Sequence, residues 1–436
     1  MTKKNPDIPA LVKNKLENYE LSTQPFLLAL SGGSDSLALF YALIACQTQL
    51  SFTFHVAHVD HGWRPESQKE AEQLEKLCMQ HHIPFYLRRL DCHLLKGNLE
   101  QACRQERLRF FNELCSEKKI QAVFLAHHQD DQVETVLKRV FEGAHWSCFA
   151  GLTEEVLVND VRLLRPLLDV SKNDLLNYLE KLKVTPVEDS TNEDQRFMRA
   201  RMRQTILPWL NQTFGKNVQS SLIKLAKDMQ EVDLYFKSKV ECCLDAIILG
   251  PFGLYLDLSQ TSFLSDLEFK YLVRVFCKRY HMNFSRKQIE LCAKALRQEK
   301  KNQIFEVLGK KLYVDRKCLF LFKDEQARKG KWVSFCDETV KDDVKPSCWK
   351  TGWLGECQVV LEAADYQLVE RSSVEVSCKS LNKWWTNHLI PAYLRDLFPL
   401  VCYQKEIVHE FLTGKCFLQK EAKKEKIKIT MRYLLE

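Results

Sequence analysis

The chain has 436 residues, of which 45% are hydrophobic and 28% are charged. This balance is typical of a folded globular protein and excludes a disordered chain, and the length predicts two or three domains rather than one core. No apolar run reaches the roughly eighteen residues that a membrane helix requires, so we expect no contact with a membrane. Because the N-terminal sequence lacks the long apolar core of a secretory signal, we expect a cytoplasmic protein.

The 17 cysteines are scattered along the chain and form no C-x-x-C pair. A zinc ribbon and a thioredoxin-type redox motif both require such pairs, so neither is predicted. We interpret the cysteines as reduced, buried thiols, which pack as small hydrophobic groups.

The formal charge of +7 is concentrated in two clusters. Residues 415–432 hold seven basic residues against two acidic ones, and "RFMRARMR" places four arginines within residues 196–203. Basic clusters of this kind favour a polyanionic partner, because binding releases counterions from a phosphate backbone. A solvated surface explains the lysine-rich cluster equally well.

The first two hundred residues alternate between strand-like and helix-like patterns. We predict strands at residues 25–30, 51–59, 84–90 and 121–127, and helices at about 36–46, from 67 onward, at 98–114 and at 130–143. Alternation of this kind with continuous apolar strands indicates an α/β fold, with a parallel sheet covered by helices on both faces. In such sheets ligands bind beyond the carboxyl ends of the strands.

The rest of the chain changes character twice. A helical pattern runs from about 217 to 297, a β-like stretch covers 302–322, and charged, irregular sequence follows. We therefore predict an α/β domain at residues 1–215, a mainly helical domain at 216–325, a linker at 326–349 and a small mixed α/β domain at 350–436.

The loop "SGGSDS", residues Ser31–Ser36, lies between the first predicted strand and helix. Gly32 and Gly33 can adopt positive φ and let a ligand approach the backbone, and the following helix offers unpaired N–H groups to a phosphate. Ser31, Ser34 and Ser36 add hydroxyl donors, and Asp35 adds a carboxylate for Mg²⁺. The chain has neither G-x-x-x-x-G-K-[ST] nor G-x-G-x-x-G. A tight turn with a serine cap is the alternative.

The six-residue loop resembles the PP-loop of ATP pyrophosphatases, and other segments resemble the motifs of one PP-loop family, the tRNA(Ile)-lysidine synthetases. These segments are "HVDHGWR" (58–64), "AHHQDDQVET" (126–135), "VEDSTNEDQRFMRARMRQTILP" (187–208) and "LNKWWTNHLIPAYLRDLFPLVCY" (381–403). Their order and spread cover nearly the whole chain. Two positions depart from the family pattern: Ala200 stands where asparagine is usual, and Trp63 where leucine is usual.

The resemblance implies a ligase that uses ATP and Mg²⁺. Such an enzyme adenylates the C2 oxygen of the cytidine at the first anticodon position of tRNA(Ile) with a CAU anticodon. The ε-amine of free L-lysine then displaces AMP and leaves lysidine. The sequence gives no oligomeric state, with a homodimer as one option.

The resemblance also assigns candidate site residues. The expected ATP-binding residues are Ser31, Gly32, Gly33, Ser34, Asp35, Ser36, His58, Asp60 and His61, with Asp35 also the metal ligand. Asp131 and Glu134 are the expected lysine-binding residues, since a carboxylate must hold the ammonium and accept its proton. They are three residues apart on one helical face, although the same spacing also fits a helix cap.

Arginines are expected where charge develops on the phosphate. We predict that Arg199, Arg201 and Arg203 contact ATP or tRNA, that Arg203 acts with Asp35, Asp131 and Glu134 in catalysis, and that Lys383 and Arg395 bind tRNA. Ordinary surface charge is the alternative for the arginines. Glu100, Arg104 and Arg107 lie along one helical face, which ion pairs explain as well as substrate contact does. For His127 and His128 we favour hydrogen bonding within the site over metal binding.

Two rival functions are considered. A tRNA thiolase would need a catalytic cysteine or a cluster-binding C-x-x-C, and only the isolated Cys103 and Cys148 are candidates. A tRNA-binding protein with a relic nucleotide loop would be expected to lack the site carboxylates, but Asp35, Asp131 and Glu134 are all present.

Overall fold

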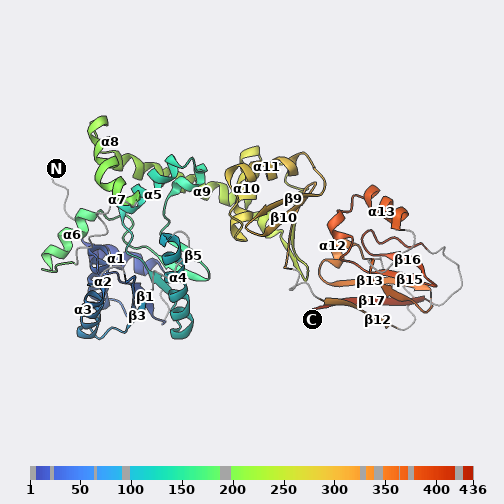
Figure 1. Cartoon of the computed structure of the whole chain (residues 1–436), viewed down its shortest axis with the longest axis horizontal. Coiled ribbons are helices and arrows are strands. Elements are labelled where there is room, and N and C mark those ends of the chain that lie inside the picture. The colour runs from blue at the N-terminus through green and yellow to red at the C-terminus, as the bar shows by residue number, and fades with distance from the viewer. Residues whose placement is uncertain are drawn as a thin grey trace. The chain divides into compact units, whose positions relative to one another are not determined.

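A computed structural model describes residues 6–19, 24–62, 66–90, 99–186, 198–324, 330–337, 347–362, 364–371, 378–417 and 426–435. The chain forms two compact units, Met1–Asp233 and Leu234–Glu436 (Figure 1). The finer division into four parts stays a prediction.

The first unit is built around a six-stranded sheet with the order β3-β2-β1-β4-β6-β5. All neighbouring strands are parallel except β5, which pairs antiparallel with β6 at one edge. The strands are β1 (Phe26–Ala29), β2 (Phe54–Asp60), β3 (Phe85–Arg89), β4 (Ala122–Phe124), β5 (Glu155–Val158) and β6 (Val161–Leu164). The predicted α/β fold with a parallel sheet is therefore confirmed.

Helices cover both faces of this sheet (Figure 1). The helices of this part of the chain are α1 (Ile8–Asn18), α2 (Ser34–Gln47), α3 (Ser67–Gln80), α4 (Leu99–Lys118), α5 (Gln129–Phe141), α6 (Lys172–Lys181), α7 (Met198–Arg201), α8 (Leu207–Phe214) and α9 (Val218–Asp245), of which α8 and α9 pack against α5. Short 3₁₀ and π turns occur at η2 (Trp146–Ala150) and η4 (Met202–Ile206).

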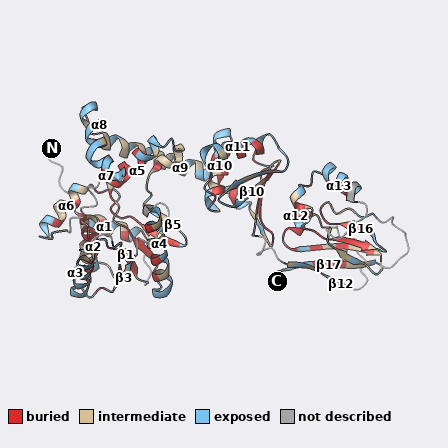
Figure 2. Ribbon diagram, in the orientation of Figure 1, coloured by how far each residue is buried: buried red, intermediate tan, exposed pale blue. Residues whose placement is uncertain are grey.

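The two faces of the sheet pack against different helices. Phe26 and Leu28 of β1 belong to a core with α1, α2 and α6, whereas Leu27 belongs to a second core with α4. Because side chains alternate along a strand, burial on both faces requires the unbroken apolar run seen in β1. Figure 2 shows the buried positions concentrated inside the unit and on the inner sides of its helices.

The second unit contains three antiparallel sheets, ordered β7-β8-β11-β10-β9, β12-β17-β13 and β14-β15-β16. Its strands are β7 (Ile248–Gly250), β8 (Gly253–Asp257), β9 (Gln303–Val307), β10 (Lys310–Asp315), β11 (Cys318–Phe322), β12 (Gly330–Asp337), β13 (Glu356–Glu362), β14 (Gln367–Val369), β15 (Leu400–Tyr403), β16 (Glu406–Glu410) and β17 (Lys426–Leu435). Its helical segments are α10 (Asp266–Arg279), α11 (Arg286–Arg297), α12 (Trp349–Gly352), α13 (Cys378–Asn387) and the 3₁₀ turn η7 (Ala392–Leu394).

Two local predictions differ from the structure. The β7–β8 hairpin lies inside the stretch 217–297 that the sequence predicts to be helical, and it completes the sheet begun by β9–β11. Strand β12 occupies part of the predicted linker and pairs with β17 along its length. Both strands gain their stability from partners far along the chain, which a local pattern does not reveal.

Aromatic residues from both sides of the predicted linker share one core in the second unit. Trp353 of the C-terminal stretch packs edge-on against Tyr255 with ring centres 5.3 Å apart, and it lies 5.8 Å from Phe320. Gly250 leaves room for this tryptophan, because a Cβ at that position would meet the Trp353 carbonyl oxygen at 2.0 Å. The segments before and after residues 326–349 thus fold against each other.

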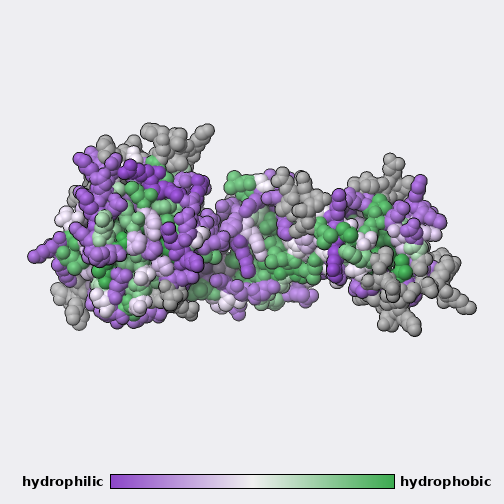
Figure 3. All heavy atoms as spheres, turned by 90° about the horizontal axis from the view of Figure 1, so that it is seen from below, coloured by the Kyte–Doolittle hydropathy of each residue, from purple (hydrophilic) through white to green (hydrophobic). Residues whose placement is uncertain are grey.

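Hydrophilic and hydrophobic residues are interspersed on the face of the molecule seen in Figure 3. Among the described residues, no helix combines the length and the apolar character that crossing a bilayer demands.

A buried histidine makes the stability of the second unit sensitive to acid. His409 is fully buried, and neither ring nitrogen has a hydrogen-bond partner among the described residues. Burial lowers the pKa of its ring to about 4. The unfolded chain, where the pKa of histidine is about 6.5, therefore takes up this proton first. The contribution of the neutral ring to the free energy of unfolding is therefore fully present above about pH 6.5, and it is lost as the pH falls toward 4.

We expect wild-type protein to lose about 2 kcal/mol more free energy of unfolding than His409→Phe between pH 7 and pH 5. Phenylalanine keeps the ring but has no proton to bind. Denaturant unfolding followed by circular dichroism at both pH values measures the difference. Substitution of the exposed His388 by Phe is the control. Equal pH dependence in the wild type and His409→Phe would contradict the expectation.

Candidate functional site

The loop Ser31–Ser36 connects the carboxyl end of β1 to the first turn of α2. Gly32 has a φ of +88°, which only glycine adopts without strain, and this turns the chain into the helix. The Ser36 hydroxyl donates to the Gly33 carbonyl oxygen over 3.0 Å and accepts from the Ser31 N–H over 3.2 Å. The loop is thus held by its own side chains, and the N–H groups of a 14-residue helix open into it.

A cavity of about 200 Å³ lies beside this loop at the carboxyl ends of β1, β2 and β4. Among its lining residues are Ser31, Asp35, Ser36, Ala57, Val59, His61, Arg107, His127 and Asp131. Its position at the strand ends is where a parallel sheet binds a ligand. The cavity therefore fits the predicted nucleotide site in place and in composition.

Side chains alternate along β2, so the residues predicted from this motif do not all point toward the cavity. Ala57 and Val59 line the cavity, whereas His58 points to the opposite face and contacts the Leu30 carbonyl oxygen through Nδ1 at 2.8 Å. Asp60 accepts from the Gly62 N–H over 2.9 Å and supports the turn. Contact of His58 and Asp60 with ATP stays a prediction, and His61 is the residue of this motif that lines the cavity.

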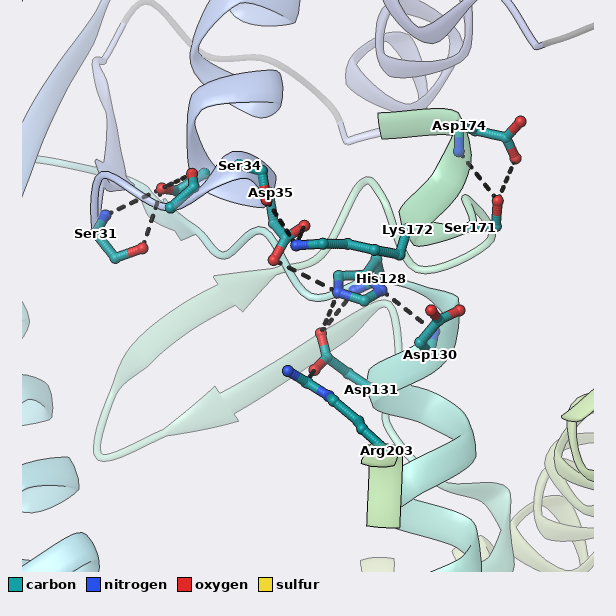
Figure 4. Close-up of polar contacts among 12 residues, drawn as sticks. Ser31, Ser34, Asp35, His128, Asp130, Asp131, Ser171, Lys172, Asp174 and Arg203 are labelled. Carbon is teal, nitrogen blue, oxygen red and sulfur yellow. Dashed lines mark hydrogen bonds and ion pairs between the residues drawn. The ribbon is translucent and has the colours of Figure 1, made fainter. Parts of the chain in front are cut away.

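A line of charged groups crosses the mouth of this loop (Figure 4). Lys172, the first residue of α6, places Nζ 2.6 Å from both Asp35 Oδ1 and Ser34 Oγ. His128 Nε2 lies 3.5 Å from Asp35 Oδ2 and 3.5 Å from Asp131 Oδ2. Burial alone would raise the pKa of the Asp35 carboxyl, but His128 and Lys172 lower it to about 2.

Asp131 has two roles. His128 is the N-cap of α5, and Asp131 Oδ2 accepts the His128 N–H over 3.0 Å in a reciprocal capping box. The other oxygen of the carboxylate accepts from Arg203 over 3.2 Å. The cap of α5 is therefore formed by His128 and Asp131, not by the Asp131–Glu134 pair that the sequence suggested, and the Asp131 carboxylate also faces the site.

Glu134 lies one turn further along α5 and takes no part in the cap. It is 2% exposed, and both its oxygens bind Arg203, one through Nε and the other through a terminal nitrogen at 3.2 Å. Burial raises the pKa of Glu134, although Arg203 opposes the rise. Burial also works against the charge on Arg203, but Glu134, Asp131 and Asp35 raise its pKa.

Arg203 projects from a π-helical turn, η4, between α7 and α8. Such turns are rare and shift the side chains of a helix relative to one another. The preceding residue Met202 and the nearby Ala200 are buried, so the turn is anchored by packing. A larger residue at position 200 would have to fit into this packed interior.

A second cavity of about 220 Å³ adjoins the first, with which it shares His61, Arg107, Phe111, Leu125 and His127. Four arginines line it: Arg104, Arg107, Arg165 and Arg199. Its described lining contains no aspartate or glutamate. Burial and the neighbouring Arg104 lower the pKa of Arg165 to about 10. A concentration of cations without acids is unfavourable until an anion binds.

His127 lies between the two cavities. Burial and the surrounding arginines lower its pKa to about 4, so the ring is neutral near pH 7. Because Arg165 Nε donates to His127 Nδ1 over 3.1 Å, the ring proton lies on Nε2. His127 is therefore a hydrogen-bond donor in a cavity wall, which agrees with the interpretation that it bonds within the site.

Several predicted residues lie elsewhere or are not described. Arg201 is exposed and contacts the Met198 sulfur, outside the lining of both cavities. Lys383 and Arg395 belong to the second unit, where Lys383 is exposed and Arg395 donates to the Ile390 carbonyl oxygen over 2.9 Å. Trp63 and the side chain of Glu100 lie outside the described residues. Their contacts with substrates stay predictions.

The residues at the loop fit Mg²⁺ bound together with ATP. Asp35 supplies a half-buried, ionised carboxylate, and Mg²⁺ at such sites takes one or two carboxylates and completes its shell with phosphate oxygens and water. The described residues contain no cluster of three acidic, histidine or cysteine side chains that could hold a metal without such a ligand. This donor set suits a metal that arrives on a nucleotide.

Lys172 and Arg165 were not singled out from the sequence. Arg165 directly follows β6, whose carboxyl end lies at the same sheet edge as that of β4. Lys172 follows the N-cap Ser171 of the next helix. A signal was available for Arg165, because a residue immediately after a parallel strand lies at the ligand-binding edge of the sheet, whereas Lys172 lies eight residues beyond β6.

Comparisons with known proteins give a consistent result. The family model of the PP-loop domain matches residues 5–210. The tRNA(Ile)-lysidine synthase of Protochlamydia amoebophila (strain UWE25) is 42% identical over 421 residues, which cover 92% of each chain. The protein of the same name from Chlamydia trachomatis serovar D is 41% identical over 260 residues, covering 59% of this chain and 78% of that one.

Among solved structures, the U34-tRNA thiolase NcsA from Methanococcus maripaludis is similar at 18% identity and a TM-score of 0.43, over 52% of this chain and 79% of its own. A TM-score below 0.5 does not support a conclusion about function, so the assignment to a family rests on the sequence relatives. The chain belongs to the tRNA(Ile)-lysidine synthase family, whose members are ligases.

Proposed function

We propose that this protein uses ATP to join free lysine to C2 of the cytidine at the first anticodon position of tRNA(Ile) with a CAU anticodon. The observation that carries the proposal is the carboxylate pair Asp131 and Glu134, which holds the guanidinium of Arg203 beside the Ser31–Ser36 loop. A site that holds one side-chain cation between two acids next to a phosphate loop suits a reaction between an amine and a nucleotide.

The reaction has two steps. In the first, the C2 oxygen of cytidine bonds to the α-phosphorus of ATP, and the bond from that phosphorus to the bridging oxygen breaks to release pyrophosphate. In the second, the ε-nitrogen of lysine bonds to C2, and the C2–oxygen bond breaks to release AMP. The lysine ammonium must lose one proton to become the attacking amine, and its nitrogen must lose a second proton after it has bonded to C2.

The Ser31–Ser36 loop and the N-terminus of α2 would hold the phosphates of ATP in the first cavity. Mg²⁺ held by Asp35 and the phosphates would supply charge neutralisation during this step. The Asp35 carboxyl has a pKa of about 2, so it stays ionised at any physiological pH.

The arginine-lined cavity would take the anticodon nucleotide. Its four cations can neutralise a nucleotide phosphate, and the neutral His127 can donate from Nε2 to an oxygen of the base or phosphate. Because the two cavities share lining residues, a cytidine in one would lie close to ATP in the other.

Lysine would bind where Arg203 now pairs with Asp131 and Glu134. A substrate ammonium can replace the guanidinium because both are cations that donate several hydrogen bonds. Glu134 is the better proton acceptor of the two carboxylates, since burial raises its pKa and it has no capping bond to maintain. Arg203, once displaced, can turn toward the phosphate of the intermediate.

The reaction is tested by incubating the protein with labelled lysine, ATP, Mg²⁺ and an isoleucine tRNA that carries a CAU anticodon. We expect label in this tRNA, with AMP released, and none in a methionine tRNA with the same anticodon. Release of AMP that depends on the tRNA but brings no label would overturn lysine as the nucleophile and favour sulfur transfer.

Glu134→Gln should lower kcat/KM for lysine about 100-fold or more, because the proton acceptor is lost while the shape is kept. The release of pyrophosphate that accompanies adenylation of tRNA without lysine should stay close to the wild-type rate. Single-turnover assays with and without lysine separate the two steps.

The matched control is Glu142→Gln, which removes an exposed carboxylate just beyond the end of the same helix. Asp131→Asn is less informative, because Asp131 accepts both the His128 N–H of the helix cap and the guanidinium of Arg203, so the change alters two contacts at once. Wild-type lysine transfer in Glu134→Gln would rule out the proposed role of this carboxylate.

Arg104→Gln should weaken binding of the tRNA and reduce the slope of log Kd against log salt by about 1, as expected for the loss of one phosphate contact. Arg109→Gln is the control, because Arg109 is exposed on the same helix and pairs with Glu106 at 3.0 Å. Filter binding at several salt concentrations gives both slopes. The same slope for both variants would place the tRNA phosphate away from this cavity.

A further inference from the structure

Lys172 brings a positive charge to a loop that has no lysine of its own. The loop lacks the lysine of a G-x-x-x-x-G-K-[ST] motif. Lys172 reaches it from 137 residues further along the chain, with Nζ at 2.6 Å from Asp35 Oδ1 (Figure 4). The same nitrogen is 2.6 Å from Ser34 Oγ in the first turn of α2.

The backbone of Lys172 is fixed by packing rather than by this ion pair. Helix α6 buries Leu175 and Leu179 in the core that it shares with α1 and α2. Its N-terminus is capped by Ser171, which accepts the Asp174 N–H over 3.2 Å. The preceding residue Val170 is buried and accepts the Gln129 N–H of α5 over 2.9 Å.

The location is unfavourable for a lysine that only stabilises the fold. Lys172 begins α6, and its ammonium lies at the start of α2, so it faces the positive ends of two helix dipoles. Asp35 offsets part of this repulsion. A phosphate group at the same point would be attracted by both helices and by the ammonium together.

We propose that Lys172 binds the β- and γ-phosphates of ATP and stabilises pyrophosphate as it leaves. The proposal rests on the use of ATP in the proposed function. As the bond between the α-phosphorus and the bridging oxygen breaks, the electron pair stays on the pyrophosphate, and its new negative charge faces the ammonium. Lys172 exchanges Asp35 for phosphate oxygens, since its side chain is 34% exposed and can turn.

Lys172→Met tests this in the full-length protein. We expect its affinity for magnesium pyrophosphate, measured by titration calorimetry, to fall about 10- to 100-fold, which is the range for a lost charged hydrogen bond. Affinity for AMP should not change, because AMP lacks the two phosphates. Lys172→Arg keeps the charge and should recover part of the affinity.

The control is Lys181→Met, which removes an exposed lysine at the other end of the same helix. If Lys172→Met lowers the melting temperature but binds pyrophosphate as the wild type does, Lys172 is an ordinary ion pair and the proposal is wrong. An equal loss for AMP and pyrophosphate would also overturn it, since it would show damage to the whole loop. The wild-type protein could also fail to transfer lysine to tRNA while its pyrophosphate binding still depends on Lys172. That result would support this inference and refute only the proposed reaction.

Discussion

The site depends on one continuous chain of alternating charges. Lys172, Asp35, His128, Asp131 and Arg203 follow one another, each within 3.5 Å of the next. They come from α6, α2, the start of α5 and the π turn, so the chain ties four separate elements to one point. Isolated buried charges are costly, and the neighbouring groups in this chain lower the pKa of Asp35 and raise the pKa values of His128 and Arg203. Removal of an inner member therefore takes one partner away from the group on each side of it.

The charged groups that line the adjoining arginine cavity, in contrast, do not alternate in sign. Its four guanidinium groups repel one another, and the described lining offers no carboxylate to offset them. Such an arrangement lowers the pKa of Arg165 and keeps His127 neutral. One half of the site is thus already paired, while the other half carries cations that, in the proposed reaction, the negative charge of a nucleotide would offset.

In the second unit, local sequence patterns predicted one group of strands and missed another. The sequence indicates a β-like stretch at 302–322, and the structure contains β9–β11 there. The hairpin at residues 248–257 was not predicted, because its strands are short and adjoin long helices. The shared aromatic core around Trp353 depends on contacts that span about a hundred residues of sequence, which neither periodicity nor composition can reveal.

The sequence by itself determined the parallel sheet, the phosphate loop and the carboxylates of α5, because these follow from local periodicity, from glycine geometry and from motif spacing. Only the tertiary structure decided which of these residues meet. Arg203 reaches Asp131 across 72 residues and Lys172 reaches Asp35 across 137, through the packing of α6 and the π turn. It also decided that His61 rather than His58 lines the cavity, since that depends on which face of β2 each helix covers. Side-chain contacts between distant elements are set by the packing of the core, and a linear pattern carries no information on that packing.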